Sequence, residues 1–596
     1  MLPRARVGAI AGVAGAMPYV IGLALMVVAM GLTGRSARAC GGLFCNATIP
    51  VGQPGPIRIV QAGERVLFAK LETGTQMIVE VRYDGDPTSF AWLLPIPKPA
   101  AGVALEDILG VSLPEIFDKL QDATEPSFFV AQITNGANAC SRANSGGGFG
   151  CDVEDDTKAS SAPNGTVDTQ DPGHPGVTIS DEARVGPYDA RLLEAVDADS
   201  LYTWLGDNGY YQDAAARPLL AHYIASGWSF IAIRLKNEAD LGDIRPITLT
   251  LGENAPCVPL RLTSIAANDD MPILVWVLGP GRAIPKNFLH AVVNDQALTF
   301  PGAPEYMARV SEAIDGASGR AWVTEFAVDP GSVPKFMEAS LRARLSASID
   351  LPKMREVLTA IGDGPTVRSI LVEELMPPAE LARAFANSPL EYMDAPGVTY
   401  VNDLATLRER LLAELVVPLE AIDTLFGEAT TLTRFVTTID PSEMTRDPVF
   451  AFNPELPLVA REHTINVETR VDKSCQQRIK VTYPDGSEVE SSLSGTTVAP
   501  VAGAPALLRV ELIDETGPAM PFDPAQVVEI DRAIAGAVAG TPTLPAGYQL
   551  NPVPRDRQAA GADEDDSCQL SLSGSFLLLP LAFLFVRARR ARRSLR

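Results

Sequence analysis

Hydrophobic and polar positions alternate along several short stretches of the chain, and this period of two predicts β-strands. In residues 76–82, Met77, Val79 and Val81 alternate with Ile78, Glu80 and Arg82, as expected for a strand with one buried face. Comparable runs predict further strands at positions 65–70, 90–97, 228–235, 246–251, 260–266, 273–278, 465–471, 479–483 and 506–513. Gly, Pro and Asn-Asp pairs between these runs indicate antiparallel sheets, with a hairpin turn at residues 484–486.

Other stretches show the spacing of amphipathic helices. Ser112-Leu113-Pro114-Glu115 has the form of a capping box with a proline in the first turn, and it predicts a helix whose buried face carries Ile116, Phe117 and Leu120. From about residue 304 to 439 the pattern is mainly helical. The predicted helices are 200–205, 214–225, 336–346, 367–386, 404–426 and one near 524–537, and Pro377-Pro378 is expected to split the segment 367–386. The fold class is therefore α+β, with antiparallel sheets and a mainly helical middle region.

Changes in composition divide the chain of 596 residues into regions. Residues 134–184 are rich in Gly, Ser, Asn, Asp and Pro and predict a flexible surface insertion. Residues 551–568 resemble a stalk. The predicted order is signal peptide 1–39, N-terminal α+β region 40–133, insertion 134–184, antiparallel sheet region 185–300, helical region 301–445, C-terminal α+β region 446–550, stalk 551–568, and transmembrane segment with arginine tail 569–596.

The N-terminus has the features of a secretory signal. Arg4 and Arg6 precede a long apolar run, and Ala37-Arg38-Ala39 offers a small-residue cleavage site before Cys40. Cleavage between Ala39 and Cys40 is the main prediction. An uncleaved anchor is an alternative because the apolar run is long. A lipoprotein is another, although Arg38 is charged where such a motif needs a small or apolar residue.

The C-terminus predicts a membrane anchor. Residues 570–586 are apolar and about 25 Å long as a helix, and six arginines follow directly. This asymmetry places the tail in the cytoplasm and the bulk of the protein outside it. Cys568 lies at the start of the segment, so we expect it to be a processing or lipidation point. An unpaired thiol or an intermolecular disulfide is the alternative.

The chain has seven cysteines. In an exported protein they favour disulfides, and no C-x-x-C pair indicates a metal site. With Cys568 set aside, short loops favour Cys40–Cys45 and Cys140–Cys151, which leaves Cys257–Cys475 as the long-range pair. No metal ligand set is predicted, because the four histidines are scattered. The acidic run at 152–156 lacks the register of a calcium loop, so a solvated charge run is the preferred interpretation.

The net charge of −24 argues against binding to nucleic acid. No nucleophile elbow, phosphate-binding loop or zinc-protease motif is present in the sequence. Aromatic side chains on the predicted strands fit a hydrophobic core better than a ligand groove, although both interpretations remain open. These aromatic residues are Phe90, Trp92, Trp228, Phe230 and Trp276.

Several segments resemble a known bacterial exported family, domain of unknown function 2330. They span roughly residues 39–300 and are Ala39–Cys45, Arg65–Ala69, Phe90–Pro97, Val185–Ala190, Trp204–Tyr210, Val258–Thr263 and Val275–Gly279. The tail is similar to the myxobacterial C-terminal sorting signal, in which a cysteine precedes a short span and an arginine cluster. This resemblance implies processing or lipidation at Cys568. The family has no established activity, so no functional residue is carried over from it to this chain.

These observations favour a non-enzymatic binding or structural protein of the cell envelope, exported and anchored by its C-terminus. Its partners are the membrane, through the C-terminal segment, and an unknown envelope or extracellular molecule. No cofactor is expected. The alternative is an envelope hydrolase with a carboxylate-based site that is assembled only in three dimensions.

Overall fold

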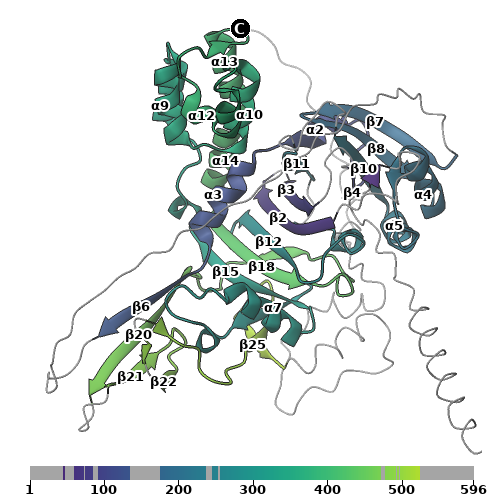
Figure 1. Cartoon of the computed structure of the whole chain (residues 1–596). Coiled ribbons are helices and arrows are strands. Elements are labelled where there is room, and N and C mark those ends of the chain that lie inside the picture. The colour runs from purple at the N-terminus through teal and green to yellow at the C-terminus, as the bar shows by residue number, and fades with distance from the viewer. Residues whose placement is uncertain are drawn as a thin grey trace, which may run out of the picture. The chain divides into compact units, whose positions relative to one another are not determined.

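The computed structural model describes residues 45–46, 60–72, 74–84, 91–133, 175–235, 244–252, 256–471, 477–491, 493–494 and 497–523. All of them belong to one compact unit. They form a mixed α+β fold (Figure 1). The predicted signal peptide, stalk, C-terminal membrane segment and helix near 524–537 lie outside these residues. Within them, no helix is long and apolar enough to span a bilayer.

The largest element is a ten-stranded sheet with the order β26-β25-β14-β15-β18-β12-β2-β3-β11-β5. Two of its pairs, β12–β2 and β14–β15, are parallel, whereas the prediction was of antiparallel sheet throughout. The strands come from four of the predicted regions. They are β2 Val60–Leu71, β3 Gly74–Asp84, β5 Leu109–Val111, β11 Ile247–Thr250, β12 Met271–Gly279, β14 Leu289–Val293, β15 Ala321–Val328, β18 Thr431–Ile439, β25 Leu507–Leu512 and β26 Met520–Phe522.

The centre of this sheet is buried on both faces. On β2, Val66 and Phe68 belong to one apolar cluster, whereas Leu67 and Ala69 belong to another. On β3, Met77, Val79 and Val81 share one face as predicted. Ile78 is buried on the opposite face. Two layers therefore cover the sheet, one on each side.

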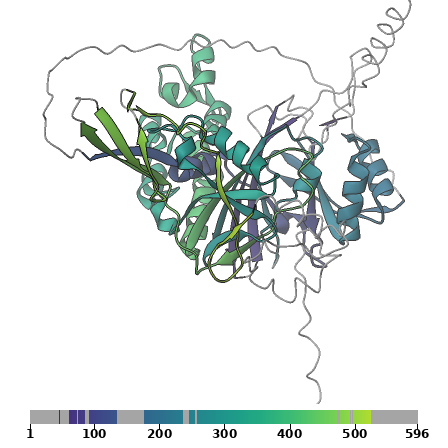
Figure 2. The same cartoon turned by 90° about the horizontal axis from the view of Figure 1, so that it is seen from below.

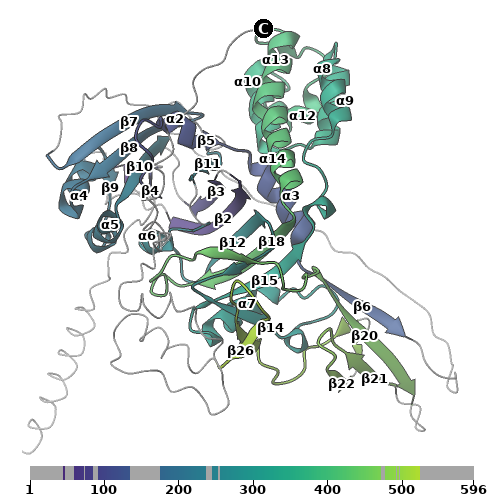
Figure 3. The same ribbon diagram turned by 180° about the vertical axis from the view of Figure 1, so that it is seen from behind.

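An apolar cluster on the face of Leu67 and Ala69 continues from α3, which packs on the sheet, into a bundle of helices that stands away from the sheet (Figure 3). The helices of this cluster all contribute buried side chains. They are α3 Pro114–Thr124, α8 Ala339–Ser346, α9 Leu351–Ile361, α10 Pro365–Glu374, α11 Ala382–Asn387, α12 Pro389–Tyr392, α13 Leu404–Leu411, the π-helix η5 Leu412–Val416 and α14 Val417–Glu428. The predicted segment 367–386 is split next to Pro377-Pro378, as expected, where Leu375–Met376 form β16, which pairs with β17, Thr399–Tyr400.

Besides the short β16 and β17, the prediction of a helical pattern through 304–439 was wrong at two long strands. After helix α7, Tyr306–Gly316, the chain forms β15, and the region ends in β18. Every residue of β18 is buried, and β15 is buried up to its last residue. A strand that is buried on both faces loses the alternation of period two, so its sequence cannot be told from that of a buried helix by pattern alone.

Two shorter predictions also need correction. Residues 260–266 were expected to be a strand, but Leu260–Thr263 form helix α6, whose buried Leu260 and Leu262 mimic strand alternation. The capping box at Ser112 does not form. Helix α3 does begin at Pro114, but its N-cap is Leu113 and makes no side-chain cap. Glu115 instead accepts hydrogen bonds from the backbone N of Thr366 (2.7 Å) and from its Oγ1 (3.0 Å), at the start of α10.

A four-stranded sheet has the order β4-β10-β8-β7. Its strands are β4 Ala91–Pro97, β7 Val177–Val185, β8 Tyr188–Ala195 and β10 Trp228–Leu235. Helices α4, Ala198–Asp207, and α5, Ala216–Ala225, pack on one face through Leu201, Trp204, Leu220 and Tyr223. Strand β7 begins inside the predicted insertion 134–184. Its alternation of half-buried and exposed residues marks an edge strand with a polar outer face.

A third sheet has the order β22-β21-β20-β6. Figure 2 shows indigo β6 beside green β20, although more than 300 residues separate them in the sequence. The strands are β6 Ser127–Ile133, β20 Glu462–Val471, β21 Gln477–Thr482 and β22 Glu488–Ser491. The predicted turn at 484–486 joins β21 to β22, with Gly486 at φ 82°.

The remaining elements are short. The strand pairs are β1 Cys45–Asn46 with β9 Tyr210–Tyr211, β13 Arg282–Pro285 with β19 Phe450–Asn453, and β23 Leu493–Ser494 with β24 Thr497–Val498. The single turns of helix are α2 Leu105–Ile108, η3 Asp295–Ala297 and η4 Pro330–Ser332.

Candidate functional site

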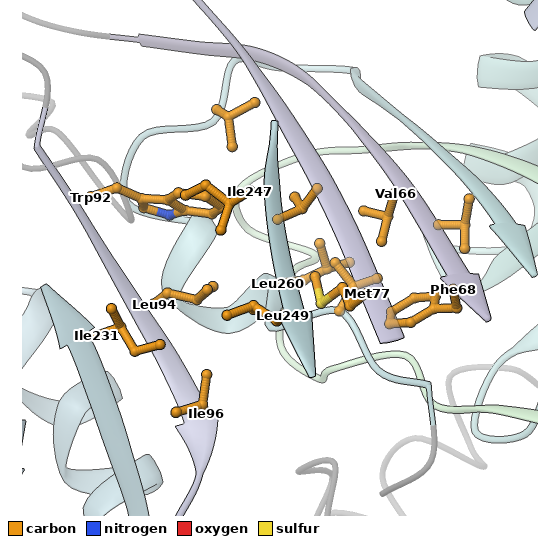
Figure 4. Packing of buried hydrophobic residues seen from close by; sticks show 14 of the residues in the cluster. Val66, Phe68, Met77, Trp92, Leu94, Ile96, Ile231, Ile247, Leu249 and Leu260 are labelled. Carbon is orange, nitrogen blue, oxygen red and sulfur yellow. The ribbon is translucent and has the colours of Figure 1, made fainter. Parts of the chain in front are cut away.

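An apolar crevice lies between the four-stranded and ten-stranded sheets. The cavity is small, about 20 Å³, which is room for one or two water molecules, and no charged side chain among the described residues lines it. Figure 4 shows the side chains that meet here, with Leu94 and Ile96 on one side and Leu249 and Met77 on the other. The lining residues are Met77, Leu94, Pro95, Ile96, Pro97, Trp228, Leu249, Leu251, Cys257 and Pro259.

The sequence of β4 explains why apolar side chains face this space. Leu94 and Ile96 alternate with Leu93 and project toward the ten-stranded sheet, whereas Leu93 packs under α4 and α5. Strand β4 is also the edge of its sheet. Pro95 and Pro97 have no backbone N–H and cannot donate to a further strand. The four-stranded sheet therefore stops at β4, and its apolar rim borders the crevice.

Trp228 is the crevice residue with an unsatisfied polar group. It opens β10 opposite Pro97 and is only 7% exposed. Its indole Nε1–H is buried and has no acceptor among the residues that the structure describes. Leaving a buried donor unpaired costs about 1–3 kcal/mol. The ring packs on the face of the sheet that α5 covers, with its centroid 5.4 Å from that of Tyr223, and the residue also borders the crevice.

The other aromatic residues of the predicted strands are part of the core. Trp92, Phe230 and Trp276 are buried in three different clusters, and Phe90 lies outside the described residues. Trp276 donates from Nε1 to Thr124 Oγ1 at 2.9 Å, so its polar group is satisfied. Trp228 is also buried in one of these clusters, although it borders the crevice, so the ligand-groove interpretation stays a prediction.

A second arrangement places a hydroxyl, an imidazole and a carboxylate in a row. Thr324 Oγ1 is 2.6 Å from His290 Nε2, and His290 Nδ1 is 3.3 Å from Glu511 Oε2. Burial lowers the pKa of His290, so its imidazole is neutral near pH 7. Burial opposes ionisation of Glu511, but hydrogen bonds from His290 and Arg509 outweigh it and lower its pKa to about 2.

The row also has a structural role. His290 Nε2 accepts a hydrogen bond from the backbone N of Thr324 at 3.0 Å. The register between β15 and β18 shifts immediately after Thr324, and the β14–β15 ladder pairs only Leu289 and His290. The imidazole therefore replaces a ladder acceptor and ties β14 to β15. A general base would need the free lone pair of His290 Nε2. That lone pair already accepts from two donors of Thr324, its Oγ1–H and its backbone N–H.

Two buried carboxylates lie apart from the crevice lining. Burial raises the pKa of Glu64 on β2 to about 7, although a hydrogen bond from Gln61 (3.0 Å) opposes the shift. Burial also raises the pKa of Glu325 on β15, against the pull of Arg434, whose Nε is 2.8 Å away. The two carboxylates lie on different strands and face different neighbours, so they do not form the two-carboxylate site of the hydrolase hypothesis.

The remaining candidate residues of the sequence are only partly described. In the described ranges, no group of three or more His, Cys, Asp or Glu side chains could hold a metal ion. Cys257 is buried beside the crevice, and Cys45 lies on β1. Ala39, Cys40, Cys140, Cys151, Cys475 and Cys568 lie outside the described residues. The disulfide pairs, the signal cleavage and the processing of Cys568 therefore stay predictions.

The crevice could not have been assembled from the sequence. Its lining comes from β3, β4, β10, β11 and the loop before α6, which are up to 182 residues apart. The local signal was the pair of prolines in β4 beside alternating apolar residues. In a comparison with known proteins, a model of a bacterial protein family matches residues 36–450. No curated protein and no solved structure matches the chain.

Proposed function

Because the chain belongs to a family of uncharacterized proteins conserved in bacteria (DUF2330), we propose its function from its own residues: it is a non-enzymatic binding protein of the cell envelope. The observation that carries this proposal is the apolar crevice with the unpaired indole N–H of Trp228. Such a site suits an apolar ligand that ends in a hydrogen-bond acceptor, for instance a short acyl chain with a carboxylate or ester. The cavity itself holds only about 20 Å³, so an acyl chain would have to displace neighbouring side chains to enter it.

The proposed location rests on the two ends of the chain. A leader that ends at Ala39 exports the protein, and the apolar segment with its arginine tail holds it at a membrane. The cysteine at position 568 is the processing or lipidation point of a myxobacterial-type sorting tail. In this location the crevice faces the envelope, where free acyl chains and lipid fragments are available.

The binding proposal is tested by titrating octanoate into the full chain held in lipid nanodiscs, with calorimetry as the measurement. Trp228→Phe keeps the apolar lining and removes the N–H, so we expect the dissociation constant to rise about tenfold. Leu249→Trp fills the crevice and should abolish binding.

The matched control is Trp322→Phe. Trp322 also carries a buried indole N–H without an acceptor among the described residues, but it lies in the core and not in the crevice. Its substitution should leave the dissociation constant unchanged. Absence of octanoate binding to the wild-type chain, or equal effects of both Trp substitutions, would contradict the proposal.

An envelope hydrolase is the second candidate, and the order Thr324–His290–Glu511 favours it. Thr324 Oγ1 would attack an acyl carbon while His290 Nε2 takes the hydroxyl proton and passes it to the leaving group, and water would then release the acyl group. The test is hydrolysis of p-nitrophenyl acetate by the full chain. A rate that falls about 100-fold in both Thr324→Val and His290→Gln supports it. Equal rates in all three proteins exclude it.

A further inference from the structure

Cys257 takes part in a disulfide bond. Its side chain is 4% exposed and belongs to the apolar cluster under helices α4 and α5. The backbone here is fastened to the segment before β19, since Cys257 pairs with Val449 in an isolated bridge and Val258 N donates to Pro448 O at 3.2 Å. The second cysteine of the bond decides which other part of the chain is tied to this cluster.

The N-terminal part of the chain is attached to the same cluster at two described points. Strand β1 pairs with β9, whose Tyr210 is a member of the cluster that contains Cys257. At the start of β2, Gln61 N donates to Ala266 O at 3.1 Å, directly after helix α6. Leu262 of α6 belongs to the cluster too. Both ends of the segment from β1 to β2 are therefore held close to the cluster of Cys257.

The third sheet holds Cys475, the partner that the sequence favours, far from this cluster. Cys475 comes two residues before Gln477 of β21, so the two Cα atoms are at most about 7 Å apart. The core of this sheet includes Phe300 and Ile479 and shares no described residue with the cluster of Cys257. Figure 1 and Figure 3 show the third sheet on one side of the ten-stranded sheet and helices α4 and α5 on the other.

We propose that Cys257 is bonded to Cys45, at the start of β1. Of the other cysteines, Cys45 is the one whose backbone the structure describes, and its strand is paired with β9 at the cluster. A cysteine whose backbone is already held there closes the bond with the smallest loss of chain entropy. This pair differs from Cys257–Cys475 and Cys40–Cys45, the pairs expected from the sequence.

The bond rests on the proposed location outside the cytoplasm, where disulfides persist. Its formation joins the two sulfur atoms, while two protons and two electrons pass to a disulfide oxidant, which is reduced to a dithiol. The bond would fasten the start of the exported chain to the layer that borders the crevice, because Cys257 is one of the crevice residues.

Thermal unfolding of the full chain in lipid nanodiscs gives one test. Cys45→Ser and Cys257→Ser should each lower the unfolding temperature by about 5 °C. The double variant should unfold no earlier than the less stable single variant, because the same bond is lost only once. The matched control combines Cys257→Ser with Cys475→Ser, whose effects should add. Additive effects of Cys45→Ser and Cys257→Ser would overturn the proposal.

Peptide mapping identifies the partner directly. The full chain is isolated from cells without reductant, its free thiols are alkylated, and it is digested with chymotrypsin, which cleaves after Phe44 and separates Cys40 from Cys45. We expect a linked pair of peptides that carry Cys45 and Cys257. Cys257 linked to any other cysteine, or Cys257 as an alkylated thiol, overturns the pairing. The cell fraction that contains the chain reports its location separately, so a wrong pairing and a wrong location are told apart.

Discussion

Glu64 shows how a single buried carboxyl makes stability depend on pH. Its side chain lies on the face of β2 that also carries Val66 and Phe68, and the hydrogen bond that it accepts comes from Gln61. Burial disfavours the charged form. The folded protein therefore holds the Glu64 proton up to a pKa of about 7, whereas the ordinary value is 4.5. Between these two values the folded state binds more protons than the unfolded state.

The sign of the pH effect follows from this proton uptake. The favourable contribution of protonated Glu64 is complete below pH 4.5 and is lost as the pH rises through 7. Glu64→Gln cannot ionise, so it should be more stable than the wild-type chain at pH 8, by up to about 3 kcal/mol, with a small difference at pH 4.5. Thermal unfolding of both proteins across this range measures the effect. Exposed Glu72, at the end of β2, provides the control Glu72→Gln. A constant difference between Glu64→Gln and the wild-type chain over this range would refute the prediction.

At the scale of elements, helix α10 is capped by a side chain from a different helix. Its N-cap is Gly364, which has no side chain to offer, and Pro365 occupies the first turn. Glu115 of α3 supplies the missing acceptor to Thr366. A Cβ at position 364 would lie 2.3 Å from Cγ of Glu115, so glycine there makes room for the contact. The capping residue predicted for α3 thus stabilises α10, 251 positions away in the sequence.

Removing this contact should destabilise the helical layer. Glu115→Ala leaves the first turn of α10 without its acceptor, and we expect the free energy of unfolding to fall by about 1–2 kcal/mol. Glu115→Gln keeps one neutral oxygen as an acceptor, so its free energy of unfolding should lie between those of the wild-type chain and Glu115→Ala. The control is Glu125→Ala, because Glu125 is exposed at the other end of the same helix. Denaturant unfolding gives the comparison, and equal losses for positions 115 and 125 would show that Glu115 does not act as a cap.

Elements with a distinct local pattern were predictable from the sequence. The bounds of β10, the start of α3 and the turn at Gly486 agree with the structure. Strands β15 and β18 were not predictable, because burial on both faces removes the alternation that marks a strand. Pairings such as that of β6 with β20 join segments more than 300 residues apart, and the sequence of neither strand indicates which partner it will have.

The candidate site, like the long-range strand pairings, could not be predicted from the sequence alone. The aromatic residues on strands were visible in the sequence, but their environments were not. Trp228 and Trp276 both occupy strands with apolar neighbours. Trp276 donates a hydrogen bond to Thr124, whereas the indole N–H of Trp228 has no acceptor among the described residues. The difference arises from what lies beside each ring after the sheets have packed. Alternation predicts which face of a strand is apolar, and it cannot predict where two apolar faces leave space between them.

At the scale of the whole molecule, the strand order of the ten-stranded sheet has a consequence for the time course of folding. Strand β2, near the start of the described chain, pairs with β12, about 200 residues later, and β14 pairs with β25, about 215 residues later. A chain with such distant pairings has a high contact order and folds slowly. When the chain folds from its N-terminus onward, the second edge of β14 stays uncovered until residues 507–512 are present to form β25. The last strands to arrive thus close one end of the sheet.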